Sequence, residues 1–185
     1  MVDTDFTNSY IETDAELEAL IGNDQRAAAV ALKAAAATAQ AWYCAEASRH
    51  IDALPLRGVR YEEEYIENGS QKDLDGDGLA QVLEFPRVID GIVQDWDAGT
   101  DLPIVPDRVK RACMEEALAL YLEQAGGSSS RAALQEAGVQ SYTIPGILQE
   151  TFAPGAVSAN RNGGMRSPAA YRLLSRYIAR SVPII

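Results

Sequence analysis

The chain has 185 residues, of which 47% are hydrophobic and 23% are charged, so a disordered chain is excluded and one domain with a buried core is expected. The formal net charge is -11 and it is unevenly spread, because residues 1–150 carry all 27 acidic residues against 11 Lys and Arg, whereas residues 151–185 carry five Arg and no acid. An acidic body of this kind repels phosphate, which argues against nucleic-acid binding by its whole surface.

The first residues, MVDTDFTNSYIETD, lack the basic and apolar regions of an export signal, and no stretch reaches the roughly 18 apolar residues that a membrane span needs. We therefore expect no membrane partner. Cys44 and Cys113 lie far apart in apolar, helix-like contexts, where an unpaired cysteine behaves as a small buried hydrophobe. Their placement favours a reducing compartment over secretion.

The N-terminal third is predicted to be helical. Thr13 and Glu16 form a capping box that predicts a short helix from residue 14 to residue 21, ending at Gly22. Residues 24–54 follow, rich in alanine and free of Gly and Pro, which predicts one helix of about 30 residues that Asp24 caps and that ends before Pro55.

In the middle of the chain, the sequence pattern changes from helical to β-like. Between Leu56 and Pro106, short β-like runs alternate with Gly, Asn and Asp, which predicts a small hairpin and loop region. Residues 107–125 then predict an amphipathic helix that ends at Gly126 and Gly127. Its expected buried stripe consists of Val109, Ala112, Cys113, Leu120 and Tyr121.

The C-terminal part is predicted to be an extended arm with a docking helix. Residues 126–166 are rich in Gly, Ser and Asn, and a final helix begins with Ser167 as N-cap and Pro168 in the first turn. One stripe of this helix is apolar and a second carries arginines at i, i+4 spacing, so we expect it either to be a solvated face or to bind an acidic partner. The predicted docking residues are Tyr171, Arg172, Leu174, Arg176, Tyr177, Ile178 and Arg180.

These elements predict a mainly α fold: a small helical bundle with a short β-hairpin and loop insertion at about 56–105, and a C-terminal arm that ends in a helix. The predicted division is a helical core at 1–125 and an arm with its docking helix at 126–185.

The sequence offers no catalytic set. His50 is the single histidine and is expected to be structural or solvent-facing, and neither a nucleophile elbow nor a phosphate-binding loop nor a paired Cys or His motif is present. We expect a protein that is not an enzyme and binds no cofactor.

The segment DLDGDGLAQVLE fits the calcium-loop pattern, with Asp73, Asp75, Asp77 and Glu84 at ligand positions. Such a loop normally lies between two helices, but Gly69 precedes it and Pro86 follows it closely. We therefore expect a tight acidic turn, in which Gly supplies positive φ and Asp bonds to nearby amides. A weak calcium-binding module stays open as an alternative.

The order of several segments resembles the head-to-tail connector proteins, also called adaptor or head-completion proteins, of tailed double-stranded-DNA phages. These segments are the capped first helix, the alanine-rich helix that ends in SRHIDALPLRGVRY, the AQVLEFPR segment, and the helix start LPIVPDRVKRACMEEALALYL. The resemblance covers residues 10–125 well and the remainder loosely. Some relatives are described as DnaT-like single-strand DNA-binding proteins.

The resemblance implies a virion protein of the neck, assembled in the host cytoplasm. Its implied partners are further copies of itself in a twelve-fold ring, the portal protein, a downstream neck or tail-completion protein, and double-stranded DNA that passes through the lumen without sequence-specific binding. The acidic body and the basic C-terminal segment agree with a channel wall and a docking segment. A single-strand DNA-binding replication protein is the alternative from another class.

Overall fold

The computed structural model describes residues 6–61, 66–67, 70–71, 83–97, 99, 102–124, 141–144, 148–151 and 164–179. These residues form five helices and four small antiparallel sheets, which confirms a mainly helical fold with a short strand region. The helices are α1 (Asp14–Ile21), α2 (Ala27–Lys33), α3 (Ala37–Asp52), α5 (Asp107–Gln124) and α7 (Pro168–Leu174).

Helix α1 has the predicted start and end. The Thr13 hydroxyl accepts a hydrogen bond from the Glu16 amide at 3.1 Å, and the Glu16 carboxylate accepts one from the Glu12 amide at 2.7 Å. The reciprocal bond of the capping box therefore reaches one residue further back than the usual pattern. Gly22 ends the helix with φ of 55°, a conformation that glycine adopts without strain.

The prediction of one long alanine-rich helix is wrong, because the chain turns between Lys33 and Ala37 and forms α2 and α3 instead. The buried side-chain amide of Gln40 donates to the carbonyl oxygens of Leu32 (3.0 Å) and Lys33 (3.2 Å), which satisfies the C-terminal end of α2. Alanine favours helix equally at every position, so the sequence pattern did not mark this turn. After the turn, α2 packs against α5.

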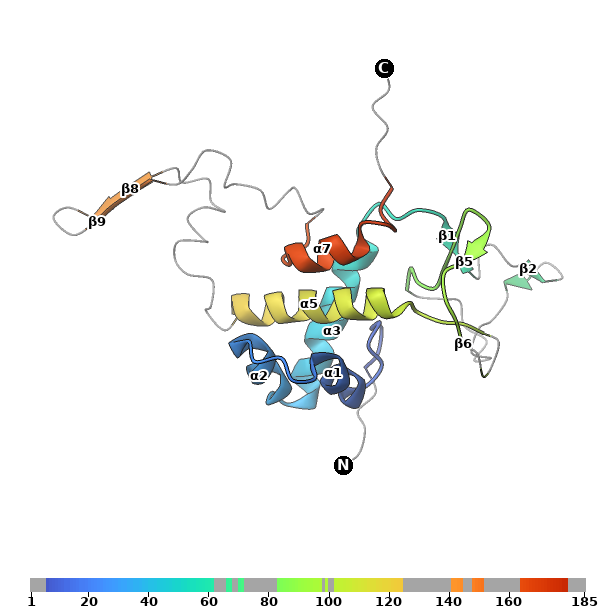
Figure 1. Ribbon diagram of the computed structural model, residues 1–185, viewed down its shortest axis with the longest axis horizontal. Coiled ribbons are helices and arrows are strands. Elements are labelled where there is room, and N and C mark those ends of the chain that lie inside the picture. Colours follow the sequence, from blue (N-terminus) through green and yellow to red (C-terminus); the bar gives the residue numbers. More distant parts are fainter. Residues whose placement is uncertain are drawn as a thin grey trace, which may run out of the picture.

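Helix α5 is the centre of the helical core (Figure 1), where it packs against α1, α2, α3 and α7. Within its predicted stripe, Val109, Ala112 and Cys113 are fully buried, and Leu120 and Tyr121 are half-buried. Each large aliphatic side chain that is fully buried contributes about 1.5–3 kcal/mol. Such residues on the other helices include Leu17, Leu32, Ile51 and Leu174.

The C-terminal helix belongs to this core. Helix α7 packs on α5, and the chain after it runs beside the end of α3 through two backbone hydrogen bonds of 2.7 Å, from Arg57 N to Tyr177 O and from Ala179 N to Pro55 O. Leu174 and Tyr177 lie in the same hydrophobic cluster as α1 to α5. The predicted boundary at residue 125 therefore does not separate two packing units, because the segment at 164–179 completes the core of the first.

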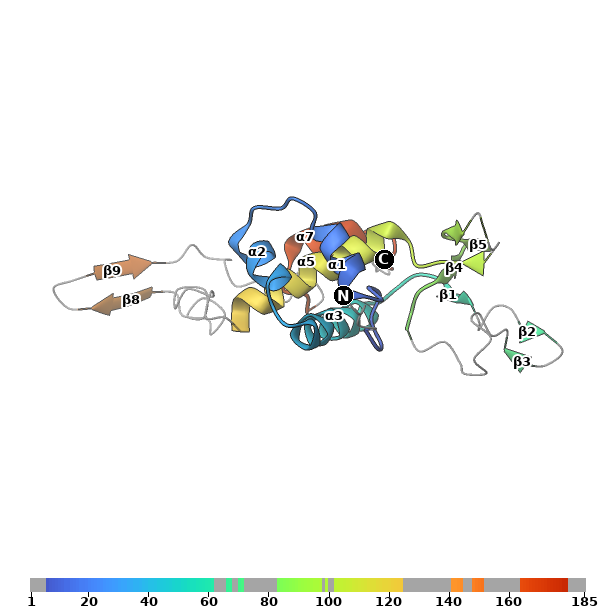
Figure 2. The same cartoon turned by 90° about the horizontal axis from the view of Figure 1, so that it is seen from below.

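The strand region lies beyond one end of the helices (Figure 2). Its main sheet has the order β1-β4-β5, with β1 (Val59–Arg60), β4 (Arg87–Ile89) and β5 (Ile92–Val93) antiparallel. Val59, Val88 and Val93 are register partners and share one face, on which Val88, Val93 and Tyr61 form a small cluster of their own. Ile89 faces the other way and joins the main core, which attaches the sheet to the helices.

Three two-stranded ribbons complete the strand content of the described residues. They pair β2 (Ile66–Glu67) with β3 (Ser70–Gln71), β6 (Trp96–Asp97) with β7 (Leu102–Pro103), and β8 (Ser141–Ile144) with β9 (Leu148–Thr151). The β8-β9 hairpin lies at the opposite end of the molecule from the main sheet (Figure 2) and was not predicted. Its strands flank a Pro-Gly pair, the turn signal that could have revealed it.

The EFPR segment joins the strand region to the helical core. The ring of Phe85 lies edge-to-face against Tyr10 (5.8 Å between centroids) and Tyr177 (5.1 Å), and so connects the two ends of the described chain. The buried Arg87 guanidinium donates to the carbonyl oxygens of Arg57 and Gly58 and pairs with Glu84. A buried guanidinium with several hydrogen-bond partners fixes the position of the EFPR segment between the strand region and the helical core.

Candidate functional site

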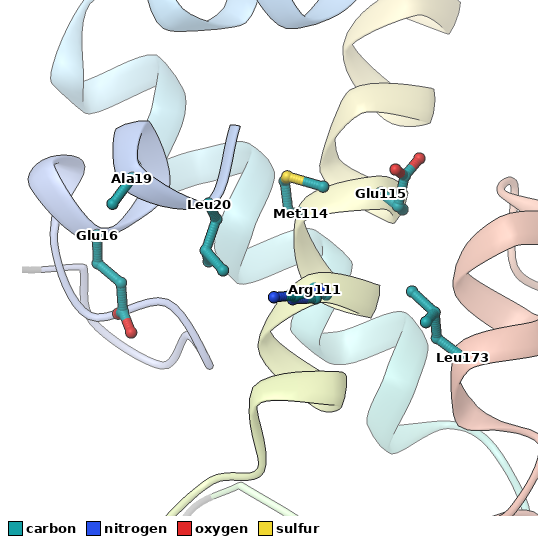
Figure 3. Close-up of a pocket in the computed structure, with 7 residues that line it drawn as sticks. All are labelled: Glu16, Ala19, Leu20, Arg111, Met114, Glu115 and Leu173. Atoms are coloured by element: carbon teal, nitrogen blue, oxygen red, sulfur yellow. The ribbon is translucent and has the colours of Figure 1, made fainter. Parts of the chain in front are cut away.

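A groove lies on the surface where α1, α5 and α7 meet. Its volume is about 590 Å³, and Arg111 and Met114 of α5 lie between Leu20 of α1 and Leu173 of α7 (Figure 3). Glu16, Ala19 and Glu115 complete the lining. The groove therefore combines an apolar floor with charged side chains at its rim, an arrangement typical of a binding surface.

A second, smaller hollow of about 350 Å³ continues the groove along α5 and α7. Arg108, Ala169 and Arg172 line it together with Glu115 and Leu173, which also line the first hollow. From here on, "the groove" means both hollows. Of the predicted docking residues that the structure describes, only Arg172 lines it.

The lining of the groove carries three arginines against two glutamates, although the protein as a whole is acidic. Glu115 pairs with Arg26, whose guanidinium donates to both carboxylate oxygens at 2.7 and 2.8 Å and also pairs with Asp24, and Glu16 pairs with Lys110 at 2.7 Å. The hydrogen bonds to Glu115 and Asp24 raise the pKa of Arg26, so its charge is fixed. Within the described part of the chain, the three groove arginines, Arg108, Arg111 and Arg172, are placed in no ion pair.

The other predicted docking residues have different environments. Leu174, Tyr177 and Ile178 are buried in the core of this chain, and Tyr171 is half-buried against it. Arg176 is exposed and its guanidinium stacks on the Tyr177 ring at 4.7 Å. Helix α7 ends at Leu174, so Arg172 and Arg176 do not form the predicted helical row, and Arg180 lies outside the described residues.

The buried carboxylate of Glu116 holds the start of α7 and thereby sets one wall of the groove. It is fully buried and accepts hydrogen bonds from the backbone amides of Arg166 and Ser167, each at 2.8 Å. His50 Nδ1 lies 2.7 Å from the same carboxylate, and this hydrogen bond raises the pKa of His50. Favourable contact between a carboxylate and a helix N-terminus is expected from the helix dipole. His50, which was predicted to be structural or solvent-facing, thus contacts the carboxylate that holds the start of α7.

Sequence reasoning missed Glu116, yet a signal was present. Position 116 follows Val109 by seven residues and Cys113 by three, so the helical period places a glutamate within the buried stripe. A carboxylate at such a position must find donors inside the fold.

Both cysteines are buried and unpaired, as predicted. Burial raises the pKa of the Cys113 thiol to about 12 and also raises the pKa of Cys44, so both remain protonated at neutral pH. A protonated, buried thiol is a poor nucleophile and metal ligand. The role of these two residues is packing.

The calcium-loop pattern falls mostly outside the described residues, which exclude Asp73, Asp75 and Asp77. Glu84 is described, and its carboxylate pairs with Arg87 and lies 3.4 Å from Arg60. Among the residues that the structure describes, no group of three His, Cys, Asp or Glu side chains could hold a metal ion. No described helix is both long enough and apolar enough to cross a membrane.

The geometry of the groove suits binding of a partner through apolar contact and positive charge. Comparisons with protein-family models, with curated proteins and with solved structures find no match to this chain.

Proposed function

We propose that this chain is the subunit of a head-to-tail connector of a tailed double-stranded-DNA phage. In this assembly, copies of the chain form a ring beneath the portal, the helices form a small bundle in each subunit, and packaged DNA passes through the lumen. The subunit works by binding neighbours on several faces and catalyses no reaction.

One observation carries the proposal: the EFPR segment contacts both the residue before the capped helix region and the end of the alanine-rich region, two other parts of the chain on which the resemblance rests. Phe85 of the EFPR segment contacts Tyr10, which precedes the first helix, and Tyr10 donates a hydrogen bond to Asp52 at the end of α3. Arg87 of the same segment binds the carbonyl oxygens of the segment after α3. The resemblance therefore rests on residues that build one buried unit, which supports a shared fold more strongly than scattered surface matches would.

Two further features support an assembly role. Strand-built extensions lie at opposite ends of the helical core (Figure 2), where they can reach neighbouring subunits. The formal charge of -11 suits a wall along which DNA must slide without being held.

The test is to mix the full-length chain with its cognate portal protein and to examine the mixture by native mass spectrometry and negative-stain imaging. We expect a ring of this chain on one face of the portal. A chain that stays monomeric in the presence of the portal would refute the connector function. Tight binding to single-stranded oligonucleotides with a steep salt dependence would instead favour the replication-type alternative.

A further inference from the structure

We infer that the groove binds an acidic amphipathic helix of a partner protein, with the apolar face of that helix against α5 and its carboxylates paired with the groove arginines. Such binding is independent of the connector function, because only the shape, the polarity and the charges of the groove require it. The partner is identified by its chemistry: apolar side chains on one helix face, flanked by Asp or Glu.

The groove is built from regular helix faces. On α5 its lining extends from Arg108 to Glu115, a distance of about 10 Å along the helix axis. On α1 and α7 the lining residues have i, i+3, i+4 spacing, and they are Glu16, Ala19 and Leu20 on α1 and Ala169, Arg172 and Leu173 on α7. Residues at this spacing lie on one side of a helix, so each helix presents a continuous face to the groove.

The shape of the groove fits a helix of about two turns. Helices α1 and α7 lie on either side of α5, and α3 packs on α5 from behind in the same view (Figure 3). Ala19 and Ala169 on the two walls have small side chains, which leave room for another helix to approach α5 closely. Leu20 and Leu173 are half-buried, and the apolar face of a bound helix would cover the part of them that is exposed.

The charges of the groove favour carboxylates. Arg108, Arg111 and Arg172 are exposed and, within the described part of the chain, are placed in no ion pair, whereas both groove glutamates already pair with cations. A guanidinium binds a carboxylate through two parallel hydrogen bonds. Arg108 and Arg111 are three residues apart, so carboxylates at i, i+3 or i, i+4 on a partner helix match their spacing.

A phosphate ligand matches only part of this surface. A nucleic acid would carry continuous negative charge past Glu16 and Glu115, and the formal charge of -11 on the protein repels it. A small phosphate ion would pair with the arginines but would leave Leu20, Met114 and Leu173 uncovered. An acidic amphipathic helix satisfies both the apolar floor and the arginines, which selects it as the occupant.

The experiment measures binding of labelled peptides to the full-length chain by fluorescence anisotropy. The probe is a peptide of about 15 residues, long enough to form a helix, with Leu at i, i+3, i+4 and i+7 and Glu on both sides of this apolar face. One comparison peptide has Lys in place of Glu, and another has the composition of the probe in an order that removes the apolar face. The probe is expected to bind at least about tenfold more tightly than either comparison peptide, because only the probe matches both features of the groove.

Two variants test the two features of the groove separately. Arg111→Glu reverses a charge beside the apolar floor, and Ala19→Trp fills space on the α1 wall with a bulky side chain. Both positions are exposed, so neither change alters the core, and retained far-ultraviolet circular dichroism shows that each variant is folded. Each variant is expected to bind the probe at least about tenfold more weakly than the unmodified chain does.

Matched controls lie on α3, outside the groove. Arg49→Glu reverses an exposed arginine, and Thr38→Trp adds the same bulky side chain at an exposed position. Both controls are expected to bind the probe as the unmodified chain does. Equal weakening in controls and test variants would overturn the inference, because the effect would then come from net charge or added bulk alone.

Other outcomes also overturn the inference. A probe that does not bind, or binds no more tightly than the lysine peptide, would show that the groove does not select acidic helices. Displacement of the probe by inorganic phosphate or a single-stranded oligonucleotide, beyond the effect of chloride at equal ionic strength, would assign the groove to phosphate. Self-association in sedimentation velocity that Ala19→Trp abolishes would assign the groove to a second copy of the chain.

The peptide experiment and the portal experiment can fail separately. A chain that binds the acidic probe but forms no ring on the portal would support this groove and refute the connector function. A chain that forms the ring but does not bind the probe would do the reverse.

Discussion

Replacement of the buried Glu116 by Gln tests how the C-terminal helix is held. Glu116 accepts three hydrogen bonds, from the amides of Arg166 and Ser167 and from His50. Glutamine has the same shape but a single acceptor oxygen, and its NH2 group would face at least one of these donors.

The magnitude follows from this geometry. One buried donor left without an acceptor costs about 1–3 kcal/mol, and the two remaining bonds each lose about 1 kcal/mol when the acceptor is no longer charged. We therefore expect Glu116→Gln to lower the free energy of unfolding by about 3–5 kcal/mol, a large part of the stability of a domain of this size.

The assay is urea unfolding followed by tryptophan fluorescence and analysed by linear extrapolation. Glu123→Gln is the matched control, because Glu123 lies on the same helix and pairs with Arg166 at 3.2 Å, but with 40% of its side chain exposed. Loss of this exposed pair should cost less than about 1 kcal/mol. If the two variants differ by less than about 0.5 kcal/mol, the buried carboxylate does not hold the helix and the reasoning fails.

Two other predictions concern the strand joint and pH. Gly58→Ala should lower the unfolding midpoint far more than Gly91→Ala. Both glycines have positive φ (74° and 76°), but a Cβ at Gly58 would lie 2.0 Å from the Val88 carbonyl oxygen, whereas a Cβ at Gly91 would meet nothing within 4 Å. Equal midpoints of the two variants in thermal unfolding would contradict this expectation. The pKa of His50 is raised in the folded chain, so the stabilisation by protonated His50 is complete below the ordinary pKa of about 6.5 and is lost as pH rises through the folded pKa. The unfolding free energy should therefore fall across this pH window for the unmodified chain and not for His50→Gln. Parallel plots of unfolding free energy against pH for the two proteins would exclude a role for the imidazolium.

Local patterns in the sequence were enough to place several elements. Thr13 and Gly22 define the start and end of α1 because capping and positive φ act within a few residues. The period of Val109, Ala112 and Cys113 predicted the buried face of α5, since a 3.6-residue repeat fixes which side chains share a face. The alternation of short β-like runs with Gly and Asp likewise predicted the strand region.

Two features depend on tertiary structure and could not be predicted from local patterns: the turn between α2 and α3, and what covers the apolar stripe of α7. Alanine gives no preference for a turn at residues 34–36, and the side chain of Gln40 on α3 satisfies the end of α2 after the turn. The apolar stripe of α7 predicted an amphipathic surface, but a stripe does not say whether the chain itself or a partner covers it; here Leu174 packs on the core of this chain.

The candidate groove likewise depends on contacts between residues far apart in the sequence. Arg172 was predicted to meet a partner from the spacing of the arginines on an amphipathic helix, whereas Arg108 and Arg111 share one surface with it because α7 packs on α5, where Glu116 binds the start of α7. Sequence thus determined which residues are basic and which helices form, through interactions among near neighbours. Packing between helices determined which of those residues share a surface. It depends on contacts between residues more than 50 positions apart along the chain, such as the hydrogen bond from Ser167 N to Glu116.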